Sequence, residues 1–254
     1  MRTKKKINNE IICVMCCYNE EKNLRDCILS LSPYVDQFVI YDDGSTDNSI
    51  ASIKDLPKVT KIIENKEKEG WMERNNRKVL LEEAKKLSKY DNPWVLCVDP
   101  DERFEERFLK KLRKITRKYN DLDIVLHVKF RELWNDLDHY RVDYVWNTKN
   151  KGLLFKLSNK MTFDYSQEHH IPWAYREIVN NTKFLNYNLY HLKMIKEQDR
   201  IDRKNLYNKL DPNKKMQKIG YDYLVDEENI KLRKVNFINK FNLEYVPDYY
   251  KRKN

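Results

Sequence analysis

Short apolar runs followed directly by polar clusters dominate the first hundred residues, and this pattern constrains the fold more than any other feature. Residues 10–16, 37–41 and 94–98 are apolar runs of the length typical of buried strands. Residues 20–31 and 74–87 carry apolar side chains at helical spacing. Alternating strands and helices predict an α/β fold whose mostly parallel sheet has helices on both faces.

Further elements continue this alternation. The polar stretch after Tyr41 leads into a predicted helix with apolar positions Ile50, Ile53 and Leu56, and residues 59–63 form a predicted strand. A basic helix is expected from Phe104 to about residue 118, followed by a strand at 124–130. Residues 131–192 are rich in aromatic residues and histidine, which predicts an α+β region, and the charged chain beyond residue 193 is expected to be helical.

Three polar clusters each begin where a predicted strand ends. They are Asn19, the pair Asp42-Asp43, and the segment Asp99-Pro100-Asp101-Glu102. In open α/β sheets, ligands bind outside the carboxyl ends of the strands. The three clusters are therefore expected to converge at one edge of the sheet.

The acidic segment Asp99-Pro100-Asp101-Glu102 has the chemistry of a divalent metal site. Two carboxylates separated by one residue share an ion or its water shell, and hard oxygen ligands suit Mg²⁺ or Mn²⁺. Such an ion leaves coordination positions for substrate phosphates and acts as a Lewis acid. The competing interpretation is a solvated acidic turn that caps the next helix.

The cluster Asp42-Asp43-Gly44-Ser45-Thr46-Asp47 suits nucleoside recognition. A carboxylate here accepts hydrogen bonds from a base or from ribose hydroxyls, and Gly44 permits a tight turn. Helix capping by Ser45, Thr46 or Asp47 is the alternative, and it explains Asp47 better than Asp43.

Together these segments resemble the family 2 glycosyltransferases, which have the GT-A (Rossmann-like) fold. The resemblance covers about residues 10–110. It rests on four motifs in the family's order: Cys16-Cys17-Tyr18-Asn19-Glu20-Glu21, Val39-Ile40-Tyr41-Asp42-Asp43-Gly44-Ser45-Thr46-Asp47, Gly70-Trp71-Met72-Glu73-Arg74-Asn75-Asn76 and Val98-Asp99-Pro100-Asp101-Glu102.

The resemblance implies roles for the donor-binding residues. Tyr18 is expected to lie against the nucleobase and Asp43 to bind the base edge, with Asp42 supporting the turn. Asn19 and Glu20 belong to the same donor-binding set. Arg74 is expected to reach the donor, since a guanidinium suits diphosphate oxygens.

Asp99 is expected near the ribose and the metal, and Asp101 is expected to ligate the metal. Pro100 stands where a small residue is commoner in the family. His191, in Tyr190-His191-Leu192, is a further candidate contact to the metal or the diphosphate.

The second half resembles the family more loosely. Leu154-Phe155-Lys156 is similar to a short strand before the acceptor site, and Glu168-His169-His170 stands where many members carry a His-Glu pair. Family members usually invert the anomeric centre, with a carboxylate as base opposite the leaving group. Glu168 is the first candidate for that base and Asp164 the second. A structural cluster of histidines is the alternative. Of the clustered aromatic residues, one or two are expected to contact substrate.

The resemblance thus implies a metal-dependent enzyme with a UDP-sugar or related donor and a glycan, lipid-linked or protein acceptor. It divides the chain into a nucleotide-sugar-binding core at 8–120, an acceptor-side region of the same domain at 121–195, and a charged helical extension at 196–254. Two alternatives remain, a nucleotidyltransferase and a basic nucleic-acid-binding protein. The first lacks its glycine-rich loop here, and the acidic edge disfavours the second.

Charge and cysteine content bear on the surroundings of the protein. The net charge of +10 fits a phosphate-bearing substrate, an anionic membrane or a compositional habit. No apolar run of spanning length and no secretory signal is seen, which predicts a cytoplasmic protein. A basic amphipathic helix at 231–253 would permit contact with the inner membrane face, and packing against the domain is the alternative. The five cysteines are expected to be reduced, with Cys13 and Cys16 too strand-like for a redox pair.

Overall fold

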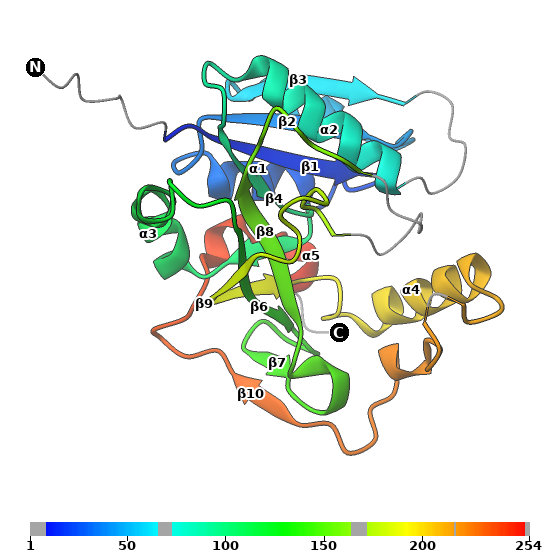
Figure 1. The fold of residues 1–254 in the computed structure, drawn as a ribbon. Coiled ribbons are helices and arrows are strands. Elements are labelled where there is room, and N and C mark those ends of the chain that lie inside the picture. Colours follow the sequence, from blue (N-terminus) through cyan, green and yellow to red (C-terminus); the bar gives the residue numbers. More distant parts are fainter. Residues whose placement is uncertain (1–8, 66–72, 164–171, 216, 252–254) are drawn as a thin grey trace, which may run out of the picture.

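The computed structural model describes residues 9–65, 73–163, 172–215 and 217–251 (Figure 1). Its main feature is an eight-stranded sheet with the order β3-β2-β1-β4-β8-β6-β9-β5. The strands are β1 (Ile11–Cys17), β2 (Gln37–Asp42), β3 (Val59–Glu64), β4 (Trp94–Cys97), β5 (Glu102–Phe104), β6 (Val125–Glu132), β8 (Asn150–Lys156) and β9 (Thr182–His191). The helices are α1 (Leu24–Leu31), α2 (Glu73–Leu87), α3 (Glu106–Lys118), α4 (Glu197–Leu210) and α5 (Asp248–Lys251).

The first four strands are all parallel. β1 pairs with β2 on one side and with β4 on the other, and β2 pairs with β3. β1 is apolar along its whole length and almost fully buried, as expected for a parallel strand that is covered on both faces. In Figure 1, α2 crosses one face of these strands and α1 lies on the other. The carboxyl ends of β1, β2 and β4 therefore meet at one edge.

The other half of the sheet is mixed. β8 is antiparallel to β4 and β6, β6 is parallel to β9, and β9 is antiparallel to β5. The short strand β5 directly follows the acidic segment, and its Glu102 is the register partner of His191 at the end of β9. This pairing brings two segments about ninety residues apart to the same edge of the sheet.

The predicted α/β fold with a mostly parallel sheet is confirmed, but one predicted helix is wrong. Around Ile50, Ile53 and Leu56 the chain forms only a 3-10 turn, Ala51–Ile53. The Asp47 carboxylate accepts the backbone N–H of Ser49 at 2.9 Å, so a side chain competes with helical hydrogen bonds. Pro57 then disfavours helical backbone at the residue before it.

In the charged C-terminal extension, α4 is helical as predicted, whereas the end of the chain follows the alternative of packing against the domain. In the described part of 231–253 there is no continuous amphipathic helix. The segment contains β10 (Leu232–Lys234), which pairs with β7 (His139–Arg141), a 3-10 turn at Leu243–Tyr245, and the four-residue α5. Its apolar side chains Phe241, Val246 and Tyr250 pack in a core cluster with Leu133 and Tyr190. Packing against the domain therefore replaces the free helix.

All five cysteines are free thiols, as predicted. Four are buried as small core residues, and Cys16 is partly exposed. None of the helices in the described ranges is long and apolar enough to cross a membrane.

Candidate functional site

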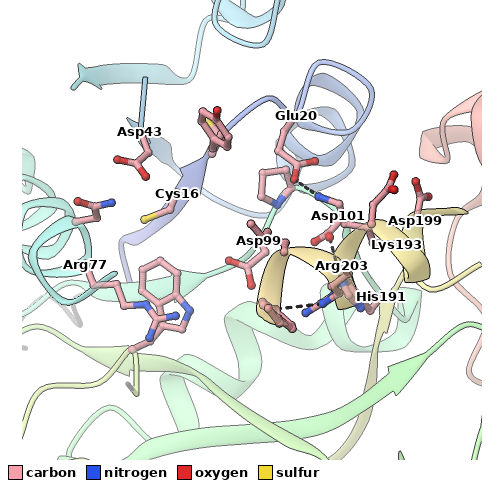
Figure 2. Close-up of a pocket in the computed structure, with 18 residues that line it drawn as sticks. Cys16, Glu20, Asp43, Arg77, Asp99, Asp101, His191, Lys193, Asp199 and Arg203 are labelled. Atoms are coloured by element: carbon pink, nitrogen blue, oxygen red, sulfur yellow. Dashed lines mark hydrogen bonds and ion pairs between the residues drawn. The ribbon is translucent and has the colours of Figure 1, made fainter. Parts of the chain in front are cut away.

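A cavity of about 510 Å³ opens at the carboxyl edge of the parallel strands (Figure 2). The end of β1 contributes Cys16 to its wall, the loop after β1 contributes Tyr18 and Glu20, and Asp43 lines it directly after β2. The acidic segment after β4 lines the floor, α2 contributes Asn76 and Arg77, and α4 closes the other side with Asp199, Asp202, Arg203, Leu206 and Tyr207. The polar clusters expected at one edge therefore meet around one cavity.

Asn19 and Asp42 build the turns beside this cavity and do not line it. Asn19 has a left-handed backbone with φ 53°, and its N–H donates to Ser45 Oγ at 2.9 Å. Its side-chain Oδ1 accepts the N–H of Thr46 at 2.8 Å. The buried Asp42 accepts the N–H of Ser45 at 3.1 Å. These contacts join the loops after β1 and β2 and fix the positions of their neighbours Tyr18 and Asp43.

Tyr18 and Asp43 face the cavity from those two loops. The Tyr18 side chain is 44% exposed, which leaves its ring accessible. The Asp43 carboxylate accepts a hydrogen bond from Asn65 Nδ2 at 3.4 Å, and its backbone N–H donates to Cys17 O at 2.9 Å. A flat ring and a carboxylate at adjacent loop ends provide the chemistry to bind a planar base.

Glu20 lies farther along the cavity and is fully engaged. Its Oε1 is 2.7 Å from Lys193 Nζ, and its Oε2 accepts Asn23 Nδ2 at 2.8 Å. Burial raises the pKa of Glu20, and the nearby Lys193 opposes that rise. Glu20 thus anchors Lys193 on the cavity wall.

The two aspartates of the acidic segment have different surroundings. Asp99 is partly exposed, and its Oδ2 is 2.6 Å from Lys151 Nζ on β8. Lys151 also binds Glu102 Oε1 at 2.6 Å, while Glu102 Oε2 accepts the N–H of Asp99 at 2.9 Å. Burial raises the pKa of Glu102 to about 7 despite the lysine. Lys151 therefore balances the negative charge of Asp99.

Asp101 is buried and faces His191. Its Oδ2 is 2.9 Å from His191 Nε2, and His191 Nδ1 contacts the Glu132 carboxylate. Glu132 is in turn 3.0 Å from Lys149 Nζ. Burial alone would lower the pKa of His191, but the carboxylates of Asp101 and Glu132 outweigh it and raise the pKa to about 9.

The same contacts also shift the pKa of Asp101. Burial would raise the pKa of Asp101, but His191 holds it well below its ordinary value. Arg203 on α4 adds positive charge, with its Nη1 3.2 Å from His191 Nε2. Figure 2 shows Asp101, His191, Lys193 and Arg203 gathered at one end of the cavity.

The Asp101–His191 pair fits a divalent metal. Oxygen and nitrogen ligands lie about 2.1 Å from such an ion, so two ligands at a right angle are about 3 Å apart. The 2.9 Å between Asp101 Oδ2 and His191 Nε2 has this spacing. Among the described residues no group of three or more His, Cys, Asp or Glu side chains is arranged to hold a metal ion. An ion bound by this pair would take its remaining ligands from phosphate oxygens and water.

Several predicted site residues cannot be placed. Glu168 and Asp164, the two candidate bases, lie outside the described residues, as do His169 and His170. Arg74 belongs to the first turn of α2, but its side chain also lies outside the described part.

Sequence reasoning missed the basic groups of the cavity. Arg77, one turn beyond Arg74, lines it with its guanidinium carbon 4.6 Å from the centre of the Trp173 ring. Trp173 is the one tryptophan of the aromatic region that reaches the cavity, whereas Trp134 and Trp146 pack in a separate core cluster. Lys193 and Arg203 belong to no motif. The only available signal for Arg203 was the helical spacing of Asp199, Arg203 and Leu206 on one face.

A model of a known protein family matches more than half of the chain. Residues 12–181 match the family model described as Glycosyl transferase family 2. Two curated relatives are glycosyltransferase SunS of Bacillus phage SPbeta and the SPbeta prophage-derived glycosyltransferase SunS of Bacillus subtilis. Each is 23% identical over 184 residues, which cover 71% of this chain. The match spans 39% of the length of those relatives.

Solved structures with similarity include glucosyl-3-phosphoglycerate synthase from Mycobacterium tuberculosis, in complex with Mn²⁺ and UDP-glucose. It has a TM-score of 0.32 and 20% identity, over 49% of this chain and 44% of that one. HddC from Yersinia pseudotuberculosis has a TM-score of 0.44 and 12% identity, over 78% of this chain and 99% of that one.

Proposed function

Because the chain belongs to glycosyl transferase family 2, we propose that it transfers a sugar from a nucleoside diphosphate sugar, with UDP as the nucleotide, to a hydroxyl acceptor. The observation that carries this proposal is the buried Asp101–His191 pair, 2.9 Å apart at the floor of the cavity. A divalent ion that displaced the Nε2 proton of His191 would be held by these two side chains and would face the cavity.

The donor would extend along the cavity from the β1 and β2 loops toward α4. Tyr18 would stack on the nucleobase and Asp43 would bind its edge, while Asp99, held by Lys151, would contact the ribose. Arg77, Lys193 and Arg203 supply positive charge for the diphosphate. Asn19 and Asp42 act indirectly, through the turns that they build.

Asp101 and His191 would hold Mn²⁺ or Mg²⁺, and we favour Mn²⁺ because Mg²⁺ prefers ligand sets made of oxygen. A bound ion would stabilise the negative charge that develops on the departing diphosphate. His191 must lose a proton from Nε2 to bind it. Asp99 as a second carboxylate ligand remains a prediction, since its Oδ2 is bound to Lys151.

Transfer with inversion requires a base on the face of the sugar opposite the diphosphate. Glu168 remains our first candidate and Asp164 the second. Asp202 on α4 lines the cavity and is exposed, so it is a third candidate from the structure itself.

The proposal is tested by hydrolysis of UDP-sugars with Mn²⁺ in wild-type protein and in Asp101→Asn. We expect the wild type to release UDP and the variant to lose at least about 100-fold in rate, because the charged ligand is gone. The matched control is Asp121→Asn, an exposed aspartate outside the cavity, which should keep the wild-type rate.

Two outcomes would contradict the proposal. A wild type that neither binds nor hydrolyses any nucleotide sugar would remove it. Release of pyrophosphate from a nucleoside triphosphate and a sugar phosphate would favour the nucleotidyltransferase alternative.

A further inference from the structure

The segment 231–243, here named the basic loop, is an exposed surface that the proposed function does not use. Its sequence, KLRKVNFINKFNL, contains four basic residues and no acidic one. At its tip, Phe237 is 84% exposed and Ile238 is 66% exposed. In Figure 1 the loop runs along the side of the molecule away from α4, one of the elements that line the cavity.

The tip is held in place by its own hydrogen bonds. Asn236 Oδ1 accepts the N–H groups of Ile238 at 3.0 Å and Asn239 at 3.1 Å. In return, the N–H of Asn236 donates to Asn239 Oδ1 at 3.0 Å. The two asparagines therefore close a turn that presents Phe237 and Ile238 outward.

Both ends of this turn are anchored to the body of the protein. On one side, the N–H of Val235 donates to Asp138 O at 2.7 Å. On the other, the buried Tyr190 donates its hydroxyl to Asn239 O at 2.8 Å, and the N–H of Glu106 donates to Lys240 O at 3.0 Å. Because the loop is fixed at both ends, exposure of the two apolar side chains is a property of the fold.

Basic side chains lie on both sides of this apolar tip, and Asp138 and Glu106 lie beside them. Within the described residues, Lys231, Arg233 and Lys234 are exposed and form no ion pair. Lys240 lies with its Nζ 5.2 Å from the centre of the Phe237 ring and 3.8 Å from Glu106 Oε1. A nucleic acid would use the cations, and a single strand would also stack a base on Phe237, but it would leave the aliphatic Ile238 in water. An anionic bilayer offers headgroup charge to the cations and an apolar interior to both side chains of the tip.

We propose that the basic loop docks the protein on an anionic lipid bilayer, with Phe237 and Ile238 inserted below the headgroups and Arg233 and Lys234 at the headgroup phosphates. Figure 1 shows α4, which lines the cavity, on the side away from the loop, so docking through the loop would leave the α4 side accessible to donor and acceptor. The inference does not depend on the proposed transferase activity.

The test is cosedimentation of the full chain with vesicles of phosphatidylcholine, with and without phosphatidylglycerol. We expect binding only to the vesicles that contain phosphatidylglycerol, and weaker binding as salt is added. Phe237→Ser with Ile238→Ser should weaken the partition coefficient at least about tenfold. Arg233→Gln with Lys234→Gln should weaken it about fivefold for each charge removed.

Matched controls test whether vesicle binding depends on this surface or on any exposed charged or apolar side chain. Phe184→Ser removes another exposed phenylalanine, which lies on β9, and Lys54→Gln with Lys61→Gln removes two exposed lysines elsewhere. Both controls should bind vesicles like the wild type. All variants should keep the wild-type rate of UDP-sugar hydrolysis, so failure of docking is distinct from failure of the enzyme.

Two results would overturn the inference. One is equal binding of wild type and the Phe237→Ser, Ile238→Ser variant to phosphatidylglycerol vesicles. The other is the absence of vesicle binding by the wild type at low salt. If the wild type then binds an RNA or DNA duplex through the basic loop, nucleic acid is its ligand instead.

Discussion

The two walls of the cavity are built in different ways. The wall formed by the loops after β1 and β2 carries Tyr18 and Asp43, each placed by a turn directly after a parallel strand. The wall formed by β9 and α4 carries His191 and Arg203, which reach the site through pairing between distant segments. Tyr18 is 44% exposed, whereas His191 is 3% exposed.

Because of this difference, we expect substitutions on the first wall to affect mainly substrate binding and substitutions on the second wall to affect stability as well. A side chain that a local turn presents to solvent is only partly packed, so its loss should affect substrate binding more than stability. His191 is held between the carboxylates of Asp101 and Glu132 in a buried network. Its loss should therefore cost both function and folding free energy.

The largest effect is expected for His191→Ala. Without the imidazole, Asp101 and Glu132 remain buried beside one another's charge, and breaking a buried pair costs about 3–5 kcal/mol of unfolding free energy. Loss of a metal ligand should also reduce Mn²⁺-dependent hydrolysis at least about 100-fold. Urea unfolding and initial rates at several Mn²⁺ concentrations measure the two effects.

The matched control for this variant is His139→Ala. His139 makes a similar contact, with its Nδ1 2.9 Å from Asp136 Oδ2, but both side chains are largely in solvent. An exposed pair contributes at most about 1 kcal/mol. Equal losses of stability in the two variants would contradict the contrast between the walls.

The contrast also explains what the sequence could predict. Tyr18, Asp43 and Asp99 each follow an apolar run, so strand ends and turn residues were enough to bring them to one edge. Lys151 contacts Asp99, and Arg203 contacts His191, because β8 and α4 fold back over that edge. No local sequence pattern predicts these long-range contacts. The expected helix around Ile53 failed for a related reason, since its spacing ignored the competing Asp47 side chain.

An intermediate effect is expected in the pH dependence of stability of metal-free protein. The pKa of His191 is raised from 6.5 to about 9, so the charged imidazole stabilises the fold fully below pH 6.5. That contribution, up to about 3 kcal/mol, is lost as pH rises through 9. The lowered pKa values of Asp101 and Glu132 act in the other direction, because their contribution is lost as pH falls into the acid range.

His191→Gln isolates the alkaline part of this dependence. The variant cannot gain a proton, so its unfolding free energy should vary little between pH 6.5 and 9, while that of the wild type falls. The comparison uses urea unfolding in a chelating buffer. If the unfolding free energy falls equally in both proteins, the loss of stability at alkaline pH comes from other groups. His191 is then not the main charge of this wall.

The smallest effect is expected for Tyr18→Ala, on the opposite wall. Stacking of a base on an aromatic ring is worth about 1–3 kcal/mol, so the KM for the donor should rise about tenfold or more while kcat changes little. The melting temperature should stay within a degree of wild type, because the ring is 44% exposed.

Tyr18→Phe should keep the wild-type KM, and Tyr90→Ala, at an exposed tyrosine outside the cavity, controls for surface changes. A Tyr18→Ala protein that loses stability as His191→Ala does would mean that both walls fold as one network, and that exposure does not separate binding from stability here.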